Sequence, residues 1–173
     1  VPCNIGHCGK CGCTQNMYLA NISMVYSNNH VDGYGSTKSE KHVSFKKFIL
    51  ENSDIASICE VGAATGHLAH SIVDESDINY TIVERDYHGK PHDRINVVET
   101  FFEEAEENKI KSDCLLMSDL FEHFYQPLKA LKKIKSCGYK YLILNHPNLE
   151  YAIQNNYCTV LNVEHTYQLE NQT

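Results

Sequence analysis

The sequence predicts an α/β fold built on a parallel sheet, and two observations support this prediction. Five short apolar runs recur along the chain, at residues 58–61, 80–83, 95–98, 114–117 and 141–144. The stretches at residues 67–74, 101–108 and 127–136 have helical spacing, with Glu or Lys on their polar sides. Strands that alternate with helices form a parallel sheet covered on both faces. Ligands of such sheets bind beyond the carboxyl ends of the strands, so we expect the functional residues in the loops after the runs.

The chain divides into three segments, the third being the α/β region from about residue 40 to about residue 147. Residues 1–15 are rich in Cys and Gly, and a polar stretch with several aromatic residues continues to residue 39. In residues 40–50 the apolar positions suit one helical face better than strict alternation, which predicts a helix. We therefore expect a Cys-rich head with a substrate linker at residues 1–39 and an α/β domain at residues 40–173.

Composition excludes several classes of function. The 173 residues, 42% of them apolar, suffice for one hydrophobic core. A net charge of -7 and the lack of a Lys/Arg-rich run argue against nucleic acid as a partner and favour a small-molecule substrate. No apolar stretch approaches the roughly 20 residues of a membrane span, and the first residues do not resemble a secretory signal. We expect a cytoplasmic protein, whose oligomeric state the sequence does not determine.

A turn of small residues follows the first apolar run. After Glu60 come Gly62, Ala64 and Gly66, which let the backbone approach a bound ligand closely. The second run ends in Glu84, whose carboxylate is placed to accept hydrogen bonds from both hydroxyls of a ribose. The pair of features is more specific than either alone.

These residues resemble the class I S-adenosylmethionine-dependent methyltransferases. The first motif of that family is an acidic residue followed by Gly-x-Gly-x-Gly, with Ala64 here in place of the middle glycine, and the second motif ends in Asp or Glu. The resemblance implies a Rossmann-like core with strand order 3-2-1-4-5 and S-adenosylmethionine as cofactor. Adenine would be flanked by Phe101 and Phe102 or by the start of a helix after Thr100. The implied cofactor-binding residues are Glu60 near the sulfonium and amino acid end, Gly62, Ala64, Gly66, Glu84 at the ribose, and Ser118.

The head carries a candidate metal site. Cys8 and Cys11 are separated by two residues, and glycine permits the tight turn that aims two thiolates at one ion. Cys13 and Cys3 could complete a tetrahedral zinc site, with His7 as a substitute ligand. A second Cys pair at a distance, which such sites usually include, is absent from the sequence. A metal-free turn and a disordered reduced head therefore remain alternatives.

Three histidines and two glutamates follow the fourth and fifth runs. They are Glu122, His123, His146, Glu164 and His165. This combination suits proton abstraction, because imidazole titrates near neutrality and a neighbouring carboxylate can orient it.

The whole pattern resembles the zinc-containing sugar C-methyltransferases, which act on nucleotide-linked deoxy-ketosugars. The resemblance implies that His165 is the general base, that Glu164 is its neighbour, and that His123 holds the sugar. Asn162 stands where that family has a tyrosine. Residues implied to bind the substrate are Tyr26, His30 and Tyr34 of the linker, His146 and Asn162.

The resemblance covers most of this chain but less than half of a typical family member. We therefore expect a chain truncated at its C-terminus, near the last antiparallel strands of a complete methyltransferase sheet. An alternative function is O- or N-methylation of a capsule or lipopolysaccharide precursor, with His123 or His165 deprotonating the acceptor. A third hypothesis is an inactive module that binds a partner.

Overall fold

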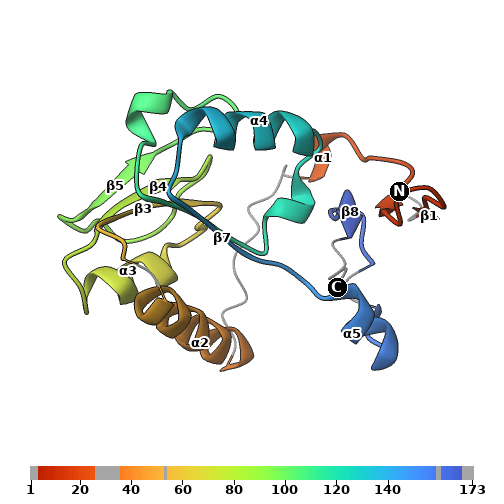
Figure 1. The fold of residues 1–173 in the computed structure, drawn as a ribbon, viewed down its shortest axis with the longest axis horizontal. Helices are drawn as coiled ribbons and strands as arrows, with labels where there is room; N and C mark the ends of the chain where they lie inside the picture. Colours follow the sequence, from red (N-terminus) through yellow and green to blue (C-terminus); the bar gives the residue numbers. More distant parts are fainter. Residues whose placement is uncertain (1–3, 26–35, 53, 159–160, 169–173) are drawn as a thin grey trace. The chain divides into compact units, whose positions relative to one another are not determined.

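The computed structural model describes residues 4–25, 36–52, 54–158 and 161–168, which pack as two compact units (Figure 1). Unit 1 combines the N-terminal residues to His30 with residues 119–127 and 145–173, and unit 2 holds residues 31–118 and 128–144. The two units thus interleave along the sequence. The division of the chain into domains at residues 39 and 40 stays a prediction.

Unit 2 is built on a five-stranded sheet with the order β5-β4-β3-β6-β7. The strands are β3 (Ser57–Val61), β4 (Asn79–Val83), β5 (Ile95–Val98), β6 (Cys114–Ser118) and β7 (Tyr141–Asn145). β3 pairs in parallel with β4 and β6, and β4 pairs in parallel with β5. Numbered along the sheet's own sequence, this order is 3-2-1-4-5, so the predicted Rossmann-like fold is confirmed.

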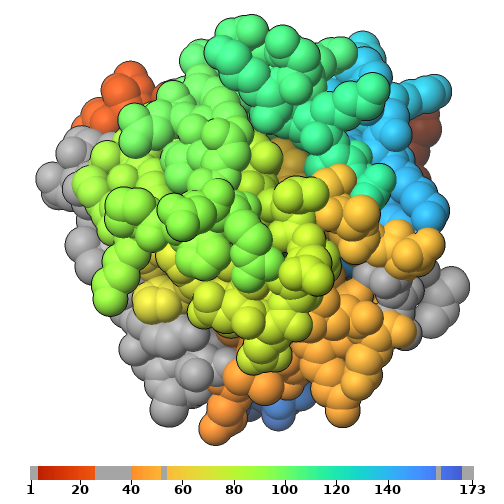
Figure 2. Space-filling view, turned by 90° about the vertical axis from the view of Figure 1, so that its left-hand side faces the viewer, coloured from red at the N-terminus to blue at the C-terminus, as the bar shows by residue number. Residues whose placement is uncertain are grey.

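Helices cover both faces of this sheet. Figure 1 shows α4 (Pro127–Cys137) on one side, and α2 (Ser36–Asn52) and α3 (His67–Val73) on the other. All three match helices expected from the sequence. The space-filling view in Figure 2 faces the edge of the sheet at β5, where the green segments around this strand dominate the surface.

The core of unit 2 lies between the sheet and its helices. Ile58, Ile72, Ile82 and Leu116 are fully buried there. Burying an aliphatic side chain of this size contributes about 1.5–3 kcal/mol to the free energy of folding. Apolar residues are therefore concentrated in the strands, where they form the runs seen in the sequence. This core fixes the carboxyl ends of β3, β4 and β6, where the site is built.

One carboxylate ties the other end of the sheet together. Asp113, just before β6, accepts hydrogen bonds from the N–H groups of Ala56 (2.9 Å) and Ser57 (3.0 Å) at the start of β3. The Ser57 hydroxyl in turn accepts the Asp113 N–H at 2.9 Å. The Ala56 hydrogen bond is the main cause that holds the pKa of Asp113 below its ordinary value.

The prediction of an α-helix at residues 101–108 is wrong. The segment makes one turn, with N–H groups of Glu104 and Ala105 bonded to the Phe101 carbonyl, and then extends at Glu106 before a short 3₁₀ helix η1 (Glu107–Lys109). The Lys133 ammonium donates to the Ala105 carbonyl at 2.5 Å. This tertiary contact takes a carbonyl that a continuing helix would use for its own backbone.

Unit 1 contains a small antiparallel sheet of order β1-β2-β8. Its strands are β1 (Ile5–His7), β2 (Thr14–Asn16) and β8 (Tyr167–Gln168), and its helices are α1 (Ile22–Val25), η2 (Phe121–His123) and α5 (Leu149–Gln154). The Cys-rich head is thus a hairpin whose second strand pairs with a strand near the other end of the chain. Over the described stretches of both units, none of the helices is long and apolar enough to cross a membrane.

Candidate functional site

The loop after β3 has an unusual backbone. Gly62 (φ 73°), Ala64 (φ 51°) and Gly66 (φ 71°) all adopt left-handed conformations. Glycine adopts this region freely, whereas an L side chain is strained there. Ala64, which stands where the family resemblance places a glycine, therefore adopts a backbone conformation that favours glycine.

Glu84 lies beside this loop. It follows Val83, which pairs with Val61, and its carboxylate Oε2 accepts the Ala64 N–H at 3.0 Å. Ser118 ends β6 directly after Met117, which pairs with Val61 from the other side. The predicted cofactor residues of these three strands thus share one edge of the sheet. A carboxylate beside a turn of small residues fits a ribose and the chain attached to it.

Glu60 is buried, with 4% of its surface exposed. The Tyr80 hydroxyl of the neighbouring strand donates to its Oε2 at 2.9 Å. Burial and the nearby Glu60 carboxylate raise the pKa of Tyr80, so this hydroxyl stays a hydrogen-bond donor. Glu60 is therefore held rigidly beneath the start of the loop.

Three residues that the sequence did not single out complete this region. The Tyr87 side chain lies against the loop. A Cβ atom added to Gly66 would be only 2.7 Å from the Tyr87 hydroxyl oxygen. A Cβ atom on Gly89 would lie 2.4 Å from the Thr65 carbonyl oxygen, so only glycine allows this close approach. The Thr65 hydroxyl is buried and makes no hydrogen bond within the described part of the chain. A ligand with a polar group would satisfy it.

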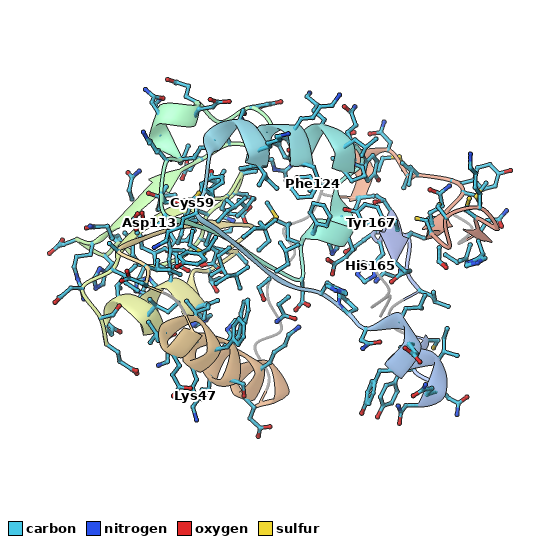
Figure 3. The ribbon with its side chains drawn as sticks, in the orientation of Figure 1. Lys47, Cys59, Asp113, Phe124, His165 and Tyr167 are labelled. Atoms are coloured by element: carbon cyan, nitrogen blue, oxygen red, sulfur yellow. The ribbon has the colours of Figure 1, made fainter. Side chains whose placement is uncertain are left out.

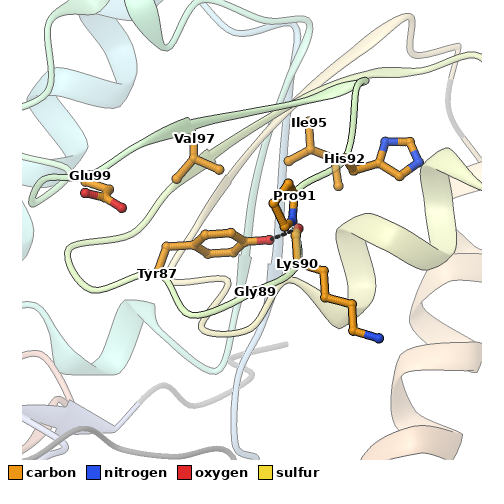
Figure 4. Close-up of a pocket in the computed structure, with 8 residues that line it drawn as sticks. All are labelled: Tyr87, Gly89, Lys90, Pro91, His92, Ile95, Val97 and Glu99. Atoms are coloured by element: carbon orange, nitrogen blue, oxygen red, sulfur yellow. Dashed lines mark hydrogen bonds between the residues drawn. The ribbon is translucent and has the colours of Figure 1, made fainter.

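A hollow of about 470 Å³ opens beside Tyr87, between the loop after β4 and the edge strand β5 (Figure 4). The Tyr87 hydroxyl donates to the Lys90 carbonyl at 3.4 Å along one wall. Its volume falls within the range of about 300–1,000 Å³ typical of small-molecule sites. None of the predicted cofactor-binding residues lines it. Its lining residues are Tyr87, Gly89, Lys90, Pro91, His92, Ile95, Val97 and Glu99.

The two phenylalanines expected near adenine differ in their surroundings. Phe102 is a core residue, 2% exposed, with the Lys133 ammonium 5.4 Å from its ring centroid. Phe101 is half-buried, and the Arg85 guanidinium lies 5.4 Å from its ring centroid. Phe101 is therefore the more exposed of the two.

A second cluster of functional side chains lies in unit 1. Ligand atoms of Glu122, His123 and His165 all lie within 4.8 Å of one another. The His123 and His165 rings meet edge to face, with centroids 4.9 Å apart. Glu122 is 1% exposed and His165 is 7% exposed, whereas His123 is half-buried. The cluster is thus open to solvent only at His123.

Hydrogen bonds hold the two segments of this cluster together. Thr166 donates its N–H and its hydroxyl to the Glu122 carbonyl, at 2.8 Å and 3.0 Å. The Tyr167 hydroxyl donates to the Phe121 carbonyl. Figure 3 shows His165 and Tyr167 beside Phe124, and the rings of Phe121 and Tyr167 meet edge to face with centroids 5.8 Å apart. Packed aromatic side chains therefore lie next to the cluster.

Three further predicted residues lie in unit 1. Glu164 is half-buried, and its charge adds to burial in raising the pKa of Tyr125. The Asn162 side-chain oxygen accepts the N–H groups of Glu164 and His165, at 2.8 Å and 3.0 Å, so it shapes the turn before the histidine. His146 is half-buried, with Nδ1 2.9 Å from the Pro147 carbonyl oxygen. The carboxylate grouped with the two histidines is that of Glu122.

The head forms a thiol knuckle within the β1–β2 hairpin. The Cys8 N–H bonds to the Cys13 carbonyl at 2.9 Å, and the Gly12 N–H bonds to the Cys8 carbonyl at 2.8 Å. Backbone N–H groups of Cys11 and Lys10 donate to the Cys8 sulfur and lower its pKa. Cys13 does not join Cys8 and Cys11 in any group of three potential metal ligands that the structure describes, and His7 Nδ1 lies 3.1 Å from the Thr14 hydroxyl.

Four predicted site residues lie outside the described residues. They are Cys3 of the candidate metal site and Tyr26, His30 and Tyr34 of the substrate linker.

Comparison with protein families matches residues 37–156 to the family described as "Methyltransferase domain". Comparison with curated protein sequences gives no match. The matched range includes the whole five-stranded sheet, Glu84 and the two residues Glu122 and His123.

Several solved structures are similar to the chain. A putative methyltransferase in complex with the Trm112 methyltransferase activator from Haloferax volcanii is 12% identical, with a TM-score of 0.58 over 78% of this chain and 66% of that chain. The plantazolicin methyltransferase BpumL in complex with SAH is 14% identical, with a TM-score of 0.53 over 70% and 50%. The N-methyltransferase NodS from Bradyrhizobium japonicum is 12% identical, with a TM-score of 0.50 over 72% and 75%. The matches cover 58%, 52% and 40% of the first three structures, so this chain spans about half of their length.

Proposed function

Because the chain belongs to the methyltransferase domain family, we propose that it transfers a methyl group from S-adenosylmethionine to a small-molecule acceptor. The observation that carries this proposal is the Glu84 carboxylate, which lies against the left-handed loop at the carboxyl ends of β3 and β4. Bound there, the cofactor supplies an electrophilic methyl group on a positively charged sulfur.

The residues around this loop have separate roles in the proposal. Glu84 accepts hydrogen bonds from the ribose hydroxyls, with Ala64 N–H fixing one oxygen of its carboxylate. Glu60, which accepts the Tyr80 hydroxyl, is proposed to lie near the positively charged sulfonium end. The Thr65 hydroxyl is a further contact, because it is buried and a ligand can satisfy it.

The proposed acceptor is a carbon beside the ketone of a nucleotide-linked deoxy-ketosugar, with His165 as general base. Support comes from the burial of His165 against His123 and from the Glu122 carboxylate in the same cluster. A nearby carboxylate stabilises the protonated ring and so strengthens the base. Glu122 takes the role that the sequence resemblance gave to Glu164, while His123 is the proposed contact to the sugar.

The proposal also includes a zinc ion in the head. Cys8 and Cys11 supply half of a tetrahedral ligand set, and the N–H groups that approach the Cys8 sulfur stabilise it as a thiolate, the form that binds zinc. Cys13 and Cys3 are the proposed remaining ligands. The zinc content of the purified protein should fall when Cys8→Ser and Cys11→Ser are introduced together.

The cofactor site is tested by calorimetric titration with S-adenosylmethionine and S-adenosylhomocysteine. Glu84→Ala should weaken both affinities at least about tenfold, because two hydrogen bonds to a charged group are lost. Asp77→Ala is the matched control, since this exposed carboxylate lies just before the opposite end of the same strand. Folded wild-type protein that binds neither compound would refute the proposal and favour the partner-binding module.

The acceptor is tested separately, by hydrogen–deuterium exchange at the carbon beside the ketone of nucleotide-linked sugars. Exchange without cofactor that His165→Asn abolishes, while cofactor affinity is kept, supports C-methylation. Methyl transfer to a hydroxyl or amine, without such exchange, would replace it with O- or N-methylation.

A further inference from the structure

We propose that Glu122, His123 and His165 bind a divalent transition-metal ion. Their ligand atoms converge within 4.8 Å, from a 3₁₀ turn after β6 and from the residues just before β8. Two imidazoles and one carboxylate form an open ligand set that zinc, iron, cobalt and nickel accept, whereas magnesium and calcium prefer oxygen ligands. The site lies outside the cofactor loop and is distinct from the thiol knuckle of the head.

The distances suit an ion after small side-chain movements. Zinc lies about 2.0–2.2 Å from nitrogen and oxygen ligands, so ligand atoms around one ion are about 3.0–3.5 Å apart. The ligand atoms must therefore approach one another by up to about 1.3–1.8 Å from their separation in the structure. Hydrogen bonds from Thr166 and Tyr167 already hold the two segments that carry these ligands together.

Burial supports the same conclusion. Glu122 is only 1% exposed, and positive charge beside a buried carboxylate offsets the cost of removing it from water. A divalent ion between Glu122 and the two imidazoles supplies that charge at the site itself. The partial exposure of His123 gives the ion a path of entry.

The surroundings of His165 resemble those of a metal-binding histidine. Such rings usually donate their second N–H to an oxygen, which fixes their orientation. The Gln168 side-chain amide lies 3.5 Å from His165 Nδ1, and its oxygen and nitrogen exchange places by a simple flip. With the oxygen toward the ring, Gln168 accepts the Nδ1 proton and leaves Nε2 for the ion.

The inference goes beyond the proposed methyl transfer and assigns His123 and His165 a role other than sugar contact and general base. Three protein ligands leave coordination positions open, and an ion there can polarise an acceptor oxygen. In the metal-bound state His165 is a ligand, so its coordinating nitrogen does not take up a proton. Metal binding is measured without cofactor or acceptor, so its failure and the failure of the methyltransferase proposal are distinguishable.

The test is a titration of chelator-treated protein with Co²⁺ alone, followed by visible absorbance and calorimetry. Cys8→Ser and Cys11→Ser are introduced first, so that the thiol knuckle does not contribute. We expect one ion per chain, with weak visible bands and no thiolate charge-transfer band. Glu122→Gln should weaken binding more than about 100-fold, beyond the 10–100-fold typical of losing a residue that only supports a ligand.

Two further variants keep the test decisive. His123→Gln changes a half-buried side chain, so it is informative even where Glu122→Gln does not fold, and it should also weaken Co²⁺ binding strongly. His92→Gln is the matched control, because this histidine also lies beside another one, His70, with ring centroids 5.5 Å apart in unit 2. No Co²⁺ binding by the folded background protein, or equal binding by the three variants, would overturn the proposal.

Discussion

Ala64 adopts a backbone conformation that favours glycine, so Ala64→Gly should raise the free energy of unfolding. With φ at 51°, an alanine carries a strain of about 1–2 kcal/mol relative to glycine. Glycine also adds entropy to the unfolded chain, which costs about 0.4–1 kcal/mol. The midpoints of these two ranges differ by about 0.8 kcal/mol, which is the expected net stabilisation. For a chain of this size Tm changes by about 2–4 °C per kcal/mol, so Tm should rise by about 2–3 °C.

The adjacent Ala63 provides a matched control. Ala63 is not among the residues with positive φ, and its methyl group packs against the core of unit 2. Ala63→Gly should therefore lower the free energy of unfolding by about 0.5–1 kcal/mol or more, since it adds unfolded-state entropy and relieves no strain. Urea unfolding and thermal melts followed by circular dichroism measure both changes. Equal destabilisation by the two substitutions would refute the left-handed conformation of Ala64.

Three other properties of the protein are open to direct measurement. In metal-free protein, iodoacetamide should modify Cys8 rapidly and at lower pH than an ordinary thiol, because backbone N–H groups lower its pKa. Cys59 should react only after unfolding, because burial raises its pKa to about 12. Alkylation of Cys59 in folded protein, detected by mass spectrometry, would contradict its burial. Asp113→Asn should lower Tm near pH 6, because a carboxylate whose pKa is lowered by folding stabilises the folded state when it is ionised. The difference in Tm between variant and wild type should shrink as the pH falls below 3.8, where this carboxylate becomes protonated. A difference in Tm that does not depend on pH would show that the charge of Asp113 is irrelevant. Gly89→Ala should destabilise the protein by about 1–3 kcal/mol and weaken cofactor affinity, since its Cβ would lie 2.1 Å from the Tyr87 hydroxyl. Gly9→Ala is the control, because no atom lies within 4 Å of the added Cβ. Equal melting curves for the two variants would contradict the packing at Gly89.

The central strands β3 and β6 of unit 2 were predictable because they are buried on both faces. β3 and β6 consist almost wholly of buried residues, so each appears in the sequence as an apolar run whose limits agree with the structure to within one residue. The strand order followed from the family resemblance rather than from the runs themselves. Glu84 was predictable for a related reason, since its position directly after the second run places it at the carboxyl end of β4.

The small sheet of unit 1 could not be predicted in this way. Its strands are two or three residues long, too short to show a period of two, and β2 pairs with β8 across about 150 residues of sequence. Nothing local in Thr14 or Gln168 indicates that they are neighbours. The conformation of Ala64 was equally hidden, because its residue type alone argues against a left-handed backbone.

The carboxylate of the histidine cluster shows a different limit. Glu122 and Glu164 both precede a histidine in the sequence, so neighbourhood along the chain does not tell which one accompanies His165. The pairing depends on the hydrogen bonds of Thr166 to the Glu122 carbonyl, a contact between residues 44 apart. Such a contact has no counterpart in spacing or composition.

Glu122 bears on both roles considered for His165, and the two roles make opposite predictions. As the neighbour of a general base, its carboxylate stabilises the protonated ring, so activity should persist after chelation and should fall when Zn²⁺ or Co²⁺ occupies the ring nitrogen. As a fellow ligand, it holds an ion that polarises the acceptor, so chelation should abolish methyl transfer and added metal should restore it. Glu122→Gln weakens either role, but only in the second does a rise in metal concentration recover activity, since mass action then offsets the lost affinity. The metal dependence of the reaction, measured with and without Glu122, therefore assigns the role of His165.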